Sequence, residues 1–320
     1  MLAHSIQSIP AGFDVFSVEK LIDNSTTDFD LYLRVGDHFI LYGGAGYKWQ
    51  RDELSQLLRG GFDRFYLNLE DLPRATMYER LARLPAVAKE QAPPERIKSI
   101  EEVGAHFTKC LYSGDITPGT VAKGEELAGQ LVGCISEDIG CVKFLSGLAN
   151  HDYYTYYHSI RVASYATAIA VQMGLTSEDA LRNIALGGIF HDIGKKDVPI
   201  SVINKSGALT EAEWAQMRAH PTIGHNLVKD TSLAHVSQEI IVHHHERLNG
   251  SGYPHGLDAG GLLKEVQIAA VADIFDALTS SRSYQRSRTK YEALDFMKHK
   301  LLRTDVGVDI FKALVECLAT

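Results

Sequence analysis

Cysteine is scarce in this sequence, and its few copies are not spaced for a structural site. The four cysteines, Cys110, Cys134, Cys141 and Cys317, form no CxxC motif and no evenly spaced framework. That spacing argues against a structural zinc site and against a small domain held together by disulfides. We therefore expect reduced thiols in a cytoplasmic protein.

Long apolar runs and an excess of positive charge are also absent. No run approaches the roughly 20 residues that span a bilayer, and Met1 to Phe16 lacks the cationic start and apolar core of a signal peptide. We therefore expect no membrane segment. The formal net charge of −8 argues against binding to duplex nucleic acid. It leaves room for a small anionic ligand, because a few basic residues can dominate one cleft.

The composition is otherwise that of a globular protein. Hydrophobic residues make up 45% and charged residues 22% of 320 residues, a length that allows two domains. We predict an α+β chain, with a small N-terminal α/β module followed by an all-α helical bundle. The expected divisions are a module at 1–90, a helical connector at 95–149 and a bundle at 150–320.

The N-terminal module is predicted from short alternating patterns. Two β-prone runs at 30–35 and 39–42 flank Gly36-Asp37, a plausible hairpin turn. A helix is expected at 51–59 and a third strand at 62–69. The glycine-rich stretch at 43–46 lacks the lysine and the strand-then-helix context of a phosphate loop. Pro85 and Pro93-Pro94 are interpreted as the boundary of the module.

Helical patterns dominate the remaining sequence. The segment 95–149 predicts two or three helices, interrupted near Thr117-Pro118-Gly119. A capping box of Thr210 and Glu213 marks one later helix start. Further helices are expected at 155–173, 177–190, 211–229, 237–246, 264–280, 290–303 and 308–318.

Histidine is concentrated in the predicted bundle. Ten of the 14 histidines fall between positions 151 and 255, and no cysteine joins them at a ligand spacing. Imidazole and carboxylate gathered without thiolate is typical of a catalytic site for Fe, Mn or Zn. Helical bundles often build such sites from side chains on facing helices.

The pair His191-Asp192 is the centre of this pattern. It lies where a predicted helix meets Gly194, a natural C-terminal stop. Adjacent helical side chains point about 100° apart. The imidazole can therefore serve one metal while the carboxylate bridges to a second. Taken alone, such a pair is more often an ordinary helix end.

The other candidates also have plain structural explanations. His158 and His220 lie on apolar helix faces and could be core histidines. The triplet 243–245 cannot direct three imidazoles at one point, so two are expected to be ligands and one exposed. Asp273 interrupts an apolar helix, where a carboxylate is costly unless it is paired or binds metal. Asp276 could compete for that role.

Six ordered sequence blocks from about 150 to 290 resemble the HD-GYP domain, a branch of the HD metal-dependent phosphohydrolases. They begin at His158, His191, His220, His244, Asn249 and Asp273, and the fifth reads Asn-Gly-Ser-Gly-Tyr-Pro. The resemblance implies hydrolysis of the bacterial messenger cyclic di-GMP to pGpG or GMP. It implies a site for two divalent metal ions, Fe or Mn rather than Zn. The implied metal ligands are His158, His191, Asp192, His220, His244, His245 and Asp273, with His243 outside the motif.

Two departures from the family pattern bear on the site. Some members carry Glu where Tyr154 stands, which supports a third metal, so a two-metal site is expected here. The usual Arg-Pro-Tyr-Arg/Lys reads Arg282-Ser283-Tyr284-Gln285. Arg282 keeps the position expected to contact a substrate phosphate, and Arg286 is a candidate for the missing cation.

The expected catalytic residues are Asp192 and Lys195. Metal binding lowers the pKa of water toward neutrality, and Asp192 is expected to bridge the metals and orient the resulting hydroxide. Lys195 is expected to stabilise developing charge or protonate the leaving 3′ oxygen, the alternative being a lysine favoured by the helix dipole. Gly252 is expected to permit close backbone approach. Tyr253 either contacts the nucleotide or packs under its loop.

Two other functions remain open from the sequence. One is an HD hydrolase of another nucleotide, such as a cyclic GMP-AMP dinucleotide. The other is a catalytically weak module that binds cyclic di-GMP and signals through a partner. The N-terminal module is expected to be regulatory or to bind a signalling protein, and a homodimer is among the expected partners.

Overall fold

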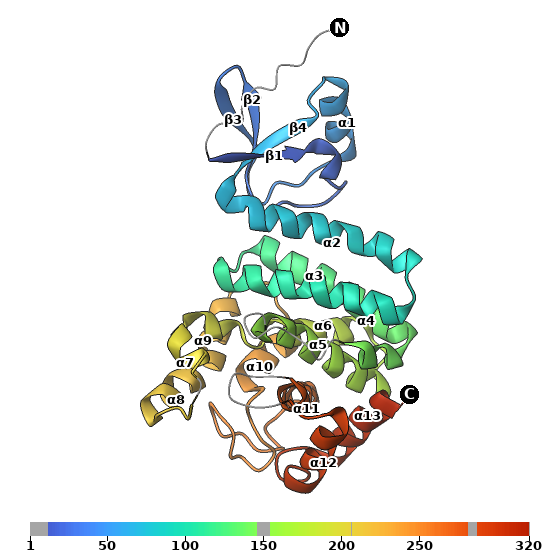
Figure 1. Ribbon diagram of the computed structural model, residues 1–320, viewed down its shortest axis with the longest axis vertical. Coiled ribbons are helices and arrows are strands. Elements are labelled where there is room, and N and C mark those ends of the chain that lie inside the picture. Colours follow the sequence, from blue (N-terminus) through green and yellow to red (C-terminus); the bar gives the residue numbers. More distant parts are fainter. Residues whose placement is uncertain (1–11, 146–153, 206, 281–286, 320) are drawn as a thin grey trace. The chain divides into compact units, whose positions relative to one another are not determined.

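The computed structural model describes residues 12–145, 154–205, 207–280 and 287–319, with backbone alone for 85–89, 154 and 155. The chain divides into two compact units, Met1–Arg83 with Thr117–Thr120, and Leu84–Ile116 with Val121–Thr320. The predicted α+β class is confirmed, because a four-stranded sheet with helices precedes a largely helical region (Figure 1). The three-part division at 1–90, 95–149 and 150–320 stays a prediction.

The N-terminal unit is built on an antiparallel sheet with strand order β1-β4-β2-β3. Its strands are β1 (Phe13–Ser17), β2 (Leu31–Val35), β3 (His38–Gly43) and β4 (Arg64–Asn68). The predicted hairpin is present, and Gly36 adopts a left-handed φ of 62° at its turn. Strand β1 was not predicted, since its pairing with β4 joins segments about 50 residues apart.

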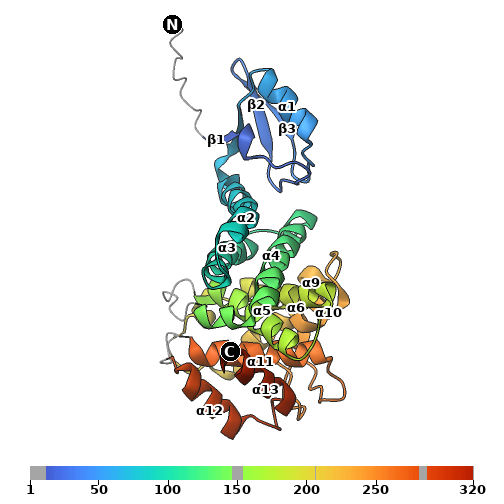
Figure 2. The ribbon, with the colours of Figure 1, turned by 90° about the vertical axis from the view of Figure 1, so that its right-hand side faces the viewer.

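The core of this unit lies between the sheet and helix α1 (Arg51–Arg59). Leu54 and Leu57 of the helix pack with Trp49, Phe65 and their neighbours. Figure 2 shows α1 beside the sheet. The short helix η1 (Val18–Lys20) lies between β1 and β2. The short helix η2 (Leu69–Asp71) follows β4 and leads into α2 (Leu72–Glu90), which runs from this unit into the next. Pro85, interpreted as a boundary, lies within α2 and directly after Leu84, the first residue of the second unit.

The second unit is largely helical. It begins with α3 (Pro93–Ser113), whose first residues are the two prolines interpreted as a boundary, because proline is tolerated in the first helical turn. Its other elements are α4 (Pro118–Glu137), η3 (Ile139–Phe144), α5 (Tyr154–Gln172), α6 (Glu178–Phe190), η5 (Ile193–Asp197), α7 (Ile200–Ile203), α8 (Glu211–Arg218), α9 (His220–Val228), α10 (His235–His243), α11 (Lys264–Thr279), α12 (Lys290–Lys300) and α13 (Val308–Ala319).

Helix α5 forms the centre of this unit. It packs against α3, α6, α11 and α13, and every side chain from 158 to 170 is buried. A helix buried on all sides must be apolar or internally paired around its circumference. Gly188 of α6 faces it so closely that a Cβ there would lie 2.6 Å from the Cα of Ala163. Polar groups on α5 therefore need buried partners.

The predicted single helix at 211–229 is wrong. Helix α8 starts at the predicted capping box of Thr210 and Glu213 but ends at Arg218, and α9 begins at His220. Pro221 has no N–H to donate to the carbonyl of Met217, four residues earlier. That carbonyl accepts a hydrogen bond from Nδ1 of His220 at 2.7 Å instead. The break thus orients a candidate ligand.

The other helices predicted by residue range match within a few residues, whereas α2 and α7 were not predicted. The largest difference is α10, which ends at His243, so that His244 and His245 follow the helix. No helix in the described part of the chain is both long and apolar enough to cross a membrane.

Candidate metal centre

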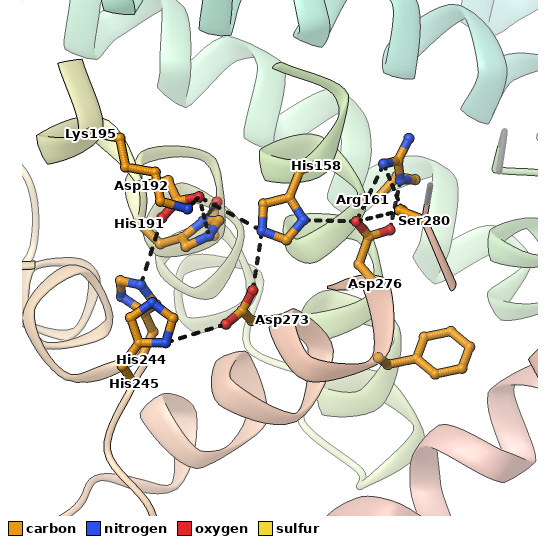
Figure 3. Close-up of polar contacts among 12 residues, drawn as sticks. His158, Arg161, His191, Asp192, Lys195, His244, His245, Asp273, Asp276 and Ser280 are labelled. Atoms are coloured by element: carbon orange, nitrogen blue, oxygen red, sulfur yellow. Dashed lines mark hydrogen bonds and ion pairs between the residues drawn. The ribbon is translucent and has the colours of Figure 1, made fainter. Parts of the chain in front are cut away.

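The seven predicted ligands come together in two buried groups. His158, His191 and Asp273 form one, and Asp192, His220, His244 and His245 form the other. Within each group the candidate ligand atoms lie within 4.8 Å of one another. They are brought together by α5, the end of α6, α9, the end of α10 and α11 (Figure 3). Two buried His/Asp clusters of this kind are consistent with a binuclear metal site.

Asp192 lies between the two groups. Its Oδ1 is 3.2 Å from Nε2 of His220, while its Oδ2 is 3.4 Å from Nε2 of His191 and 3.7 Å from Nε2 of His158. One carboxylate oxygen thus faces each group, as the bridging role requires. Asp273 also contacts both, with Oδ1 3.1 Å from Nε2 of His158 and Oδ2 3.7 Å from Nδ1 of His245.

Backbone carbonyls set the tautomers of three of these histidines. Nδ1 of His191 donates to Gly188 at 2.7 Å, that of His220 to Met217 at 2.7 Å, and that of His244 to Ile241 at 3.0 Å. A carbonyl only accepts, so each Nδ1 carries the proton and each Nε2 of the neutral ring presents a lone pair. Such outer hydrogen bonds are how proteins orient metal-binding imidazoles.

Several acceptor atoms face into the site without a hydrogen-bond donor. Nε2 of His220 and Nε2 of His244 face each other at 3.2 Å, although both present lone pairs. Nε2 of His191 and Oδ1 of Asp192 are buried without a hydrogen bond. A buried polar atom left unpaired costs about 1–3 kcal/mol. A cation between these acceptors removes that cost, so the residues fit a metal. Nitrogen and oxygen donors suit Fe, Mn or Zn.

Burial and neighbouring charge set the protonation states. Burial holds the pKa of His244 and of His245 well below the usual range, so both rings are neutral and able to bind metal. Burial alone would raise the pKa of Asp192, but His191 and Lys195 hold it well below its usual range. Burial likewise opposes the charged form of His191, yet Asp192 and Asp273 raise its pKa. Asp192 therefore keeps its negative charge, which favours a bound cation.

Asp276 does not compete with Asp273 for the metal groups. Its Oδ2 accepts from Nδ1 of His158 at 2.7 Å, and its Oδ1 accepts from Nε of Arg161 at 2.6 Å. Asp276 thus lies behind His158, on the side away from Asp273 (Figure 3). Arg161 lies in the sequence block that begins at His158, where no role was predicted for it. A buried arginine on an apolar helix is the signal in the sequence that could have found this pair.

Lys195 lies at the edge of the site. Its Nζ is 2.5 Å from Oδ2 of Asp192, and 18% of its side chain is exposed. The expectation that Gly194 stops a helix is wrong, since α6 ends at Phe190 and Gly194 lies inside η5. Gly194 is needed for close packing instead. A Cβ there would lie 1.9 Å from the carbonyl oxygen of His220.

The loop after α10 places Tyr253 on a candidate ligand. The rings of Tyr253 and His245 stack with centroids 4.7 Å apart. A Cβ at Gly252 would lie 2.3 Å from the Cα of Glu246, so the predicted close backbone approach is present. The carboxylate of Glu246 accepts from the backbone N–H of His255 at 2.7 Å and of two following residues, which holds the loop.

Three further expectations concern residues that lie outside the two groups or outside the described residues. His243 lies outside both groups, but the expectation that one histidine of the triplet is exposed is wrong, because His243 is buried with Nε2 3.0 Å from Nδ1 of His255. Arg282 and residues 283–286 lie outside the described residues, as does the side chain of Tyr154. The assignment of each residue to a ligand or substrate role stays a prediction.

Comparison with known proteins places this geometry in a family. The HD domain family matches residues 145–306. A cyclic di-GMP phosphodiesterase from Pseudomonas aeruginosa is 30% identical over 236 residues, covering 70% of this chain and 57% of that protein. A 3′3′-cGAMP-specific phosphodiesterase from Vibrio cholerae is 33% identical over 162 residues, covering 51% of this chain and 37% of that protein.

A solved structure shows the same fold. An HDG"Y"P protein from Bdellovibrio bacteriovorus aligns with a TM-score of 0.65 and 19% identity, covering 96% of this chain and 100% of that one. The chain spans 57% and 37% of the two relatives' lengths. The resemblance drawn from the six sequence blocks is confirmed: the chain belongs to the HD domain family.

Proposed function

We propose that this chain is a metal-dependent phosphodiesterase that hydrolyses cyclic di-GMP to pGpG, GMP or both. The observation that carries the proposal is the pair of facing Nε2 atoms of His220 and His244, beside a carboxylate that directs one oxygen to each histidine group. This arrangement has the donor set and the charge of a site for two divalent cations. Several relatives with matching sequence are cyclic dinucleotide phosphodiesterases.

The residues that would hold the metals are those of the two groups, with Asp192 shared between them. Two bound divalent metals supply a nucleophile by lowering the pKa of water, and they neutralise charge on the phosphate. We propose Fe or Mn rather than Zn, as the HD-GYP resemblance implies. Neutral His244 and His245 are ready to bind without first losing a proton.

Other residues would act on the substrate. Lys195, with its ammonium beside Asp192, is positioned to stabilise developing charge or to protonate the leaving 3′ oxygen. Tyr253, fixed against His245, would contact a nucleotide base, and Gly252 would keep the loop close to the site. Arg282 is proposed to bind a phosphate, since guanidinium forms bidentate contacts with that group.

A second candidate substrate is 3′3′-cGAMP. The Vibrio cholerae relative specific for that dinucleotide is 33% identical to this chain, against 30% for the cyclic di-GMP phosphodiesterase. The two dinucleotides differ in one base, so base contacts rather than the metal residues would decide between them.

The two substrates are distinguished by hydrolysis measured side by side. The full chain, loaded with Mn(II) or Fe(II) under anaerobic conditions, is incubated with each dinucleotide, and the products are separated by chromatography. A higher kcat/KM for cyclic di-GMP supports the first proposal, and a higher value for 3′3′-cGAMP supports the second. Tight binding with both dinucleotides recovered intact would show a receptor instead of an enzyme.

We also propose a regulatory role for the N-terminal unit. Both groups of candidate metal ligands found among the described residues lie in the helical unit. The N-terminal unit is therefore free to bind a signalling protein or a second copy of the chain. A change in the rate of hydrolysis on deleting residues 12–68 would support this role.

A further inference from the structure

Helix α3 contacts the candidate metal centre although it precedes the part of the chain that matches the HD domain family. The match covers 145–306, whereas α3 spans Pro93–Ser113. In the helical unit α3 packs against α5 and η5, the elements that carry or follow His158 and Asp192. Two side chains of α3, Glu101 and Tyr112, reach the centre from this side.

Tyr112 binds the backbone of the residue that lies between the two metal groups. Its hydroxyl donates to the carbonyl oxygen of Asp192 at 2.8 Å. The contact restrains the peptide after Asp192 at the turn from α6 into η5.

Glu101 reaches the other metal group through two residues. Its Oε1 lies 3.5 Å from Nη1 of Arg161, and Nε of Arg161 donates to Asp276 at 2.6 Å. Asp276 in turn accepts from Nδ1 of His158 at 2.7 Å. All of these side chains are at most 2% exposed. Removing one partner of such a buried charged pair is strongly destabilising, because the other charge is left without compensation.

The packing of α3 against α5 makes these contacts close and leaves little room for them to shift. Gly104, one turn after Glu101, faces Ile160 of α5, and a Cβ at this glycine would lie 2.5 Å from Cγ1 of Ile160. Close-packed helices transmit small displacements because their interfaces do not deform freely. Glu101 and Tyr112 are thus held by a rigid helix and not by a loop.

We propose that Glu101 and Tyr112 are positioning residues for the metal centre, Tyr112 through Asp192 and Glu101 through Arg161, Asp276 and His158. The inference rests on the proposed metal site. Because α3 carries both residues, a displacement of this helix would reach both metal groups. Only two residues separate the end of α2 at Glu90 from the start of α3 at Pro93.

The test compares isosteric variants with matched controls in the full chain. Tyr112→Phe removes the hydrogen bond to Asp192 and Glu101→Gln removes the negative charge that faces Arg161. Glu102→Gln and Tyr291→Phe make the same chemical changes at exposed positions. The dissociation constant for Mn(II) is measured by competition with a chelator, and the thermal midpoint is recorded for the metal-free protein. Loss of an outer partner typically weakens metal affinity or activity about 10- to 100-fold.

We expect Mn(II) to bind at least about 10-fold more weakly to Glu101→Gln and Tyr112→Phe, with both controls unchanged. Affinities equal to those of the controls, with only a lower thermal midpoint, would overturn the proposal in favour of a structural role. If Glu101→Gln does not fold, Tyr112→Phe decides. Because the readout is metal affinity, it remains decisive even if no cyclic dinucleotide is hydrolysed, a result that would contradict the proposed function alone.

Discussion

At the scale of single residues, Asp192 is the side chain on which both metal groups depend. Its carboxylate contacts His158 and His191 with one oxygen and His220 with the other. Asp273 also contacts both groups, but through His158 and His245, whereas Asp192 is the carboxylate beside His191 and His220. His243, by contrast, has its own partners, His255 and Glu239.

Replacing Asp192 should therefore weaken metal binding without unfolding the protein. We expect Asp192→Ala to abolish hydrolysis and to lower the metal content, and His243→Ala to leave both nearly unchanged. Elemental analysis and a product assay on the two purified variants check this. Strong metal loss from His243→Ala alone would show that the wrong two histidines of the triplet were assigned as ligands.

The negative charge of Asp276 is maintained by its buried partners. Burial alone would raise its pKa, but Arg161 and His158 lower it to about 2. An unfolded aspartate titrates near about 3.9, so the folded pKa is depressed. Its contribution is complete above about pH 4 and is lost as the pH falls toward 2.

We expect Asp276→Asn to lower the free energy of unfolding of the metal-free protein by about 3–5 kcal/mol at pH 7, since Arg161 loses a buried partner. The variant should also lose less stability than the wild type between pH 4 and pH 2. Urea unfolding across this pH range measures both effects. Parallel pH profiles for the two proteins would contradict the assignment.

The site residues show how much of the site can be predicted from local sequence. His191, Asp192 and the later histidines were predicted because they stand in recognisable blocks. The outer role of Asp276 was not, because two carboxylates three residues apart on a helix look alike until a partner is known. Arg161 and Glu101 are 60 residues apart, and Tyr112 and Asp192 are 80 apart. No local pattern indicates such contacts.

At the scale of elements, the approach of η5 to α9 brings Asp192 and His220 together. Gly194 makes this approach possible, because a Cβ there would lie 1.9 Å from the carbonyl oxygen of His220 and 2.5 Å from the amide nitrogen of Gly224. The atoms in the way belong to the backbone and cannot rotate aside. Any side chain at 194 must therefore push α9 away from Asp192.

We expect Gly194→Ala to cost about 1–3 kcal/mol or more of unfolding free energy, as overpacked sites do, and to weaken Mn(II) binding. Gly133→Ala is the matched control, since nothing lies within 4 Å of its added Cβ in α4. That change should stabilise the protein by up to about 1 kcal/mol. Thermal unfolding and Mn(II) titration of both variants provide the measurement, and equal behaviour would refute the packing argument.

The elements also show where periodicity misleads. The apolar pattern at 211–229 continues across Ala219, so it predicted one helix, although Pro221 divides it into α8 and α9. Strand β1 was missed because a five-residue strand carries little pattern of its own and gains its stability from β4. Helices with longer apolar patterns, such as α11 and α6, which Ser177 caps, were predicted within a few residues.

At the scale of the whole molecule, the two compact units should respond differently to metal. All seven candidate ligands lie in the helical unit and come from five of its segments. Metal bound only by the folded state stabilises that state, by about 2.7 kcal/mol at a free concentration 100-fold above the dissociation constant. The N-terminal unit contributes none of these ligands.

We expect a chelator to lower the unfolding temperature of the helical unit and to leave the N-terminal unit unaffected. Calorimetry of the full chain, with each unit followed by its own spectroscopic probe, measures the two responses. An equal downward shift in both units would indicate that metal acts elsewhere in the chain.

The central claim is that two metal ions, held by groups joined through Asp192, hydrolyse a cyclic dinucleotide. The most direct measurement is the rate at which the metal-free full chain forms linear product from cyclic di-GMP as Mn(II) is titrated in. The predicted rate stays low through the first equivalent, rises with the second and levels off near two ions per chain, one for each ligand group. A full rate at one equivalent, or no linear product at any Mn(II) concentration, would contradict this claim.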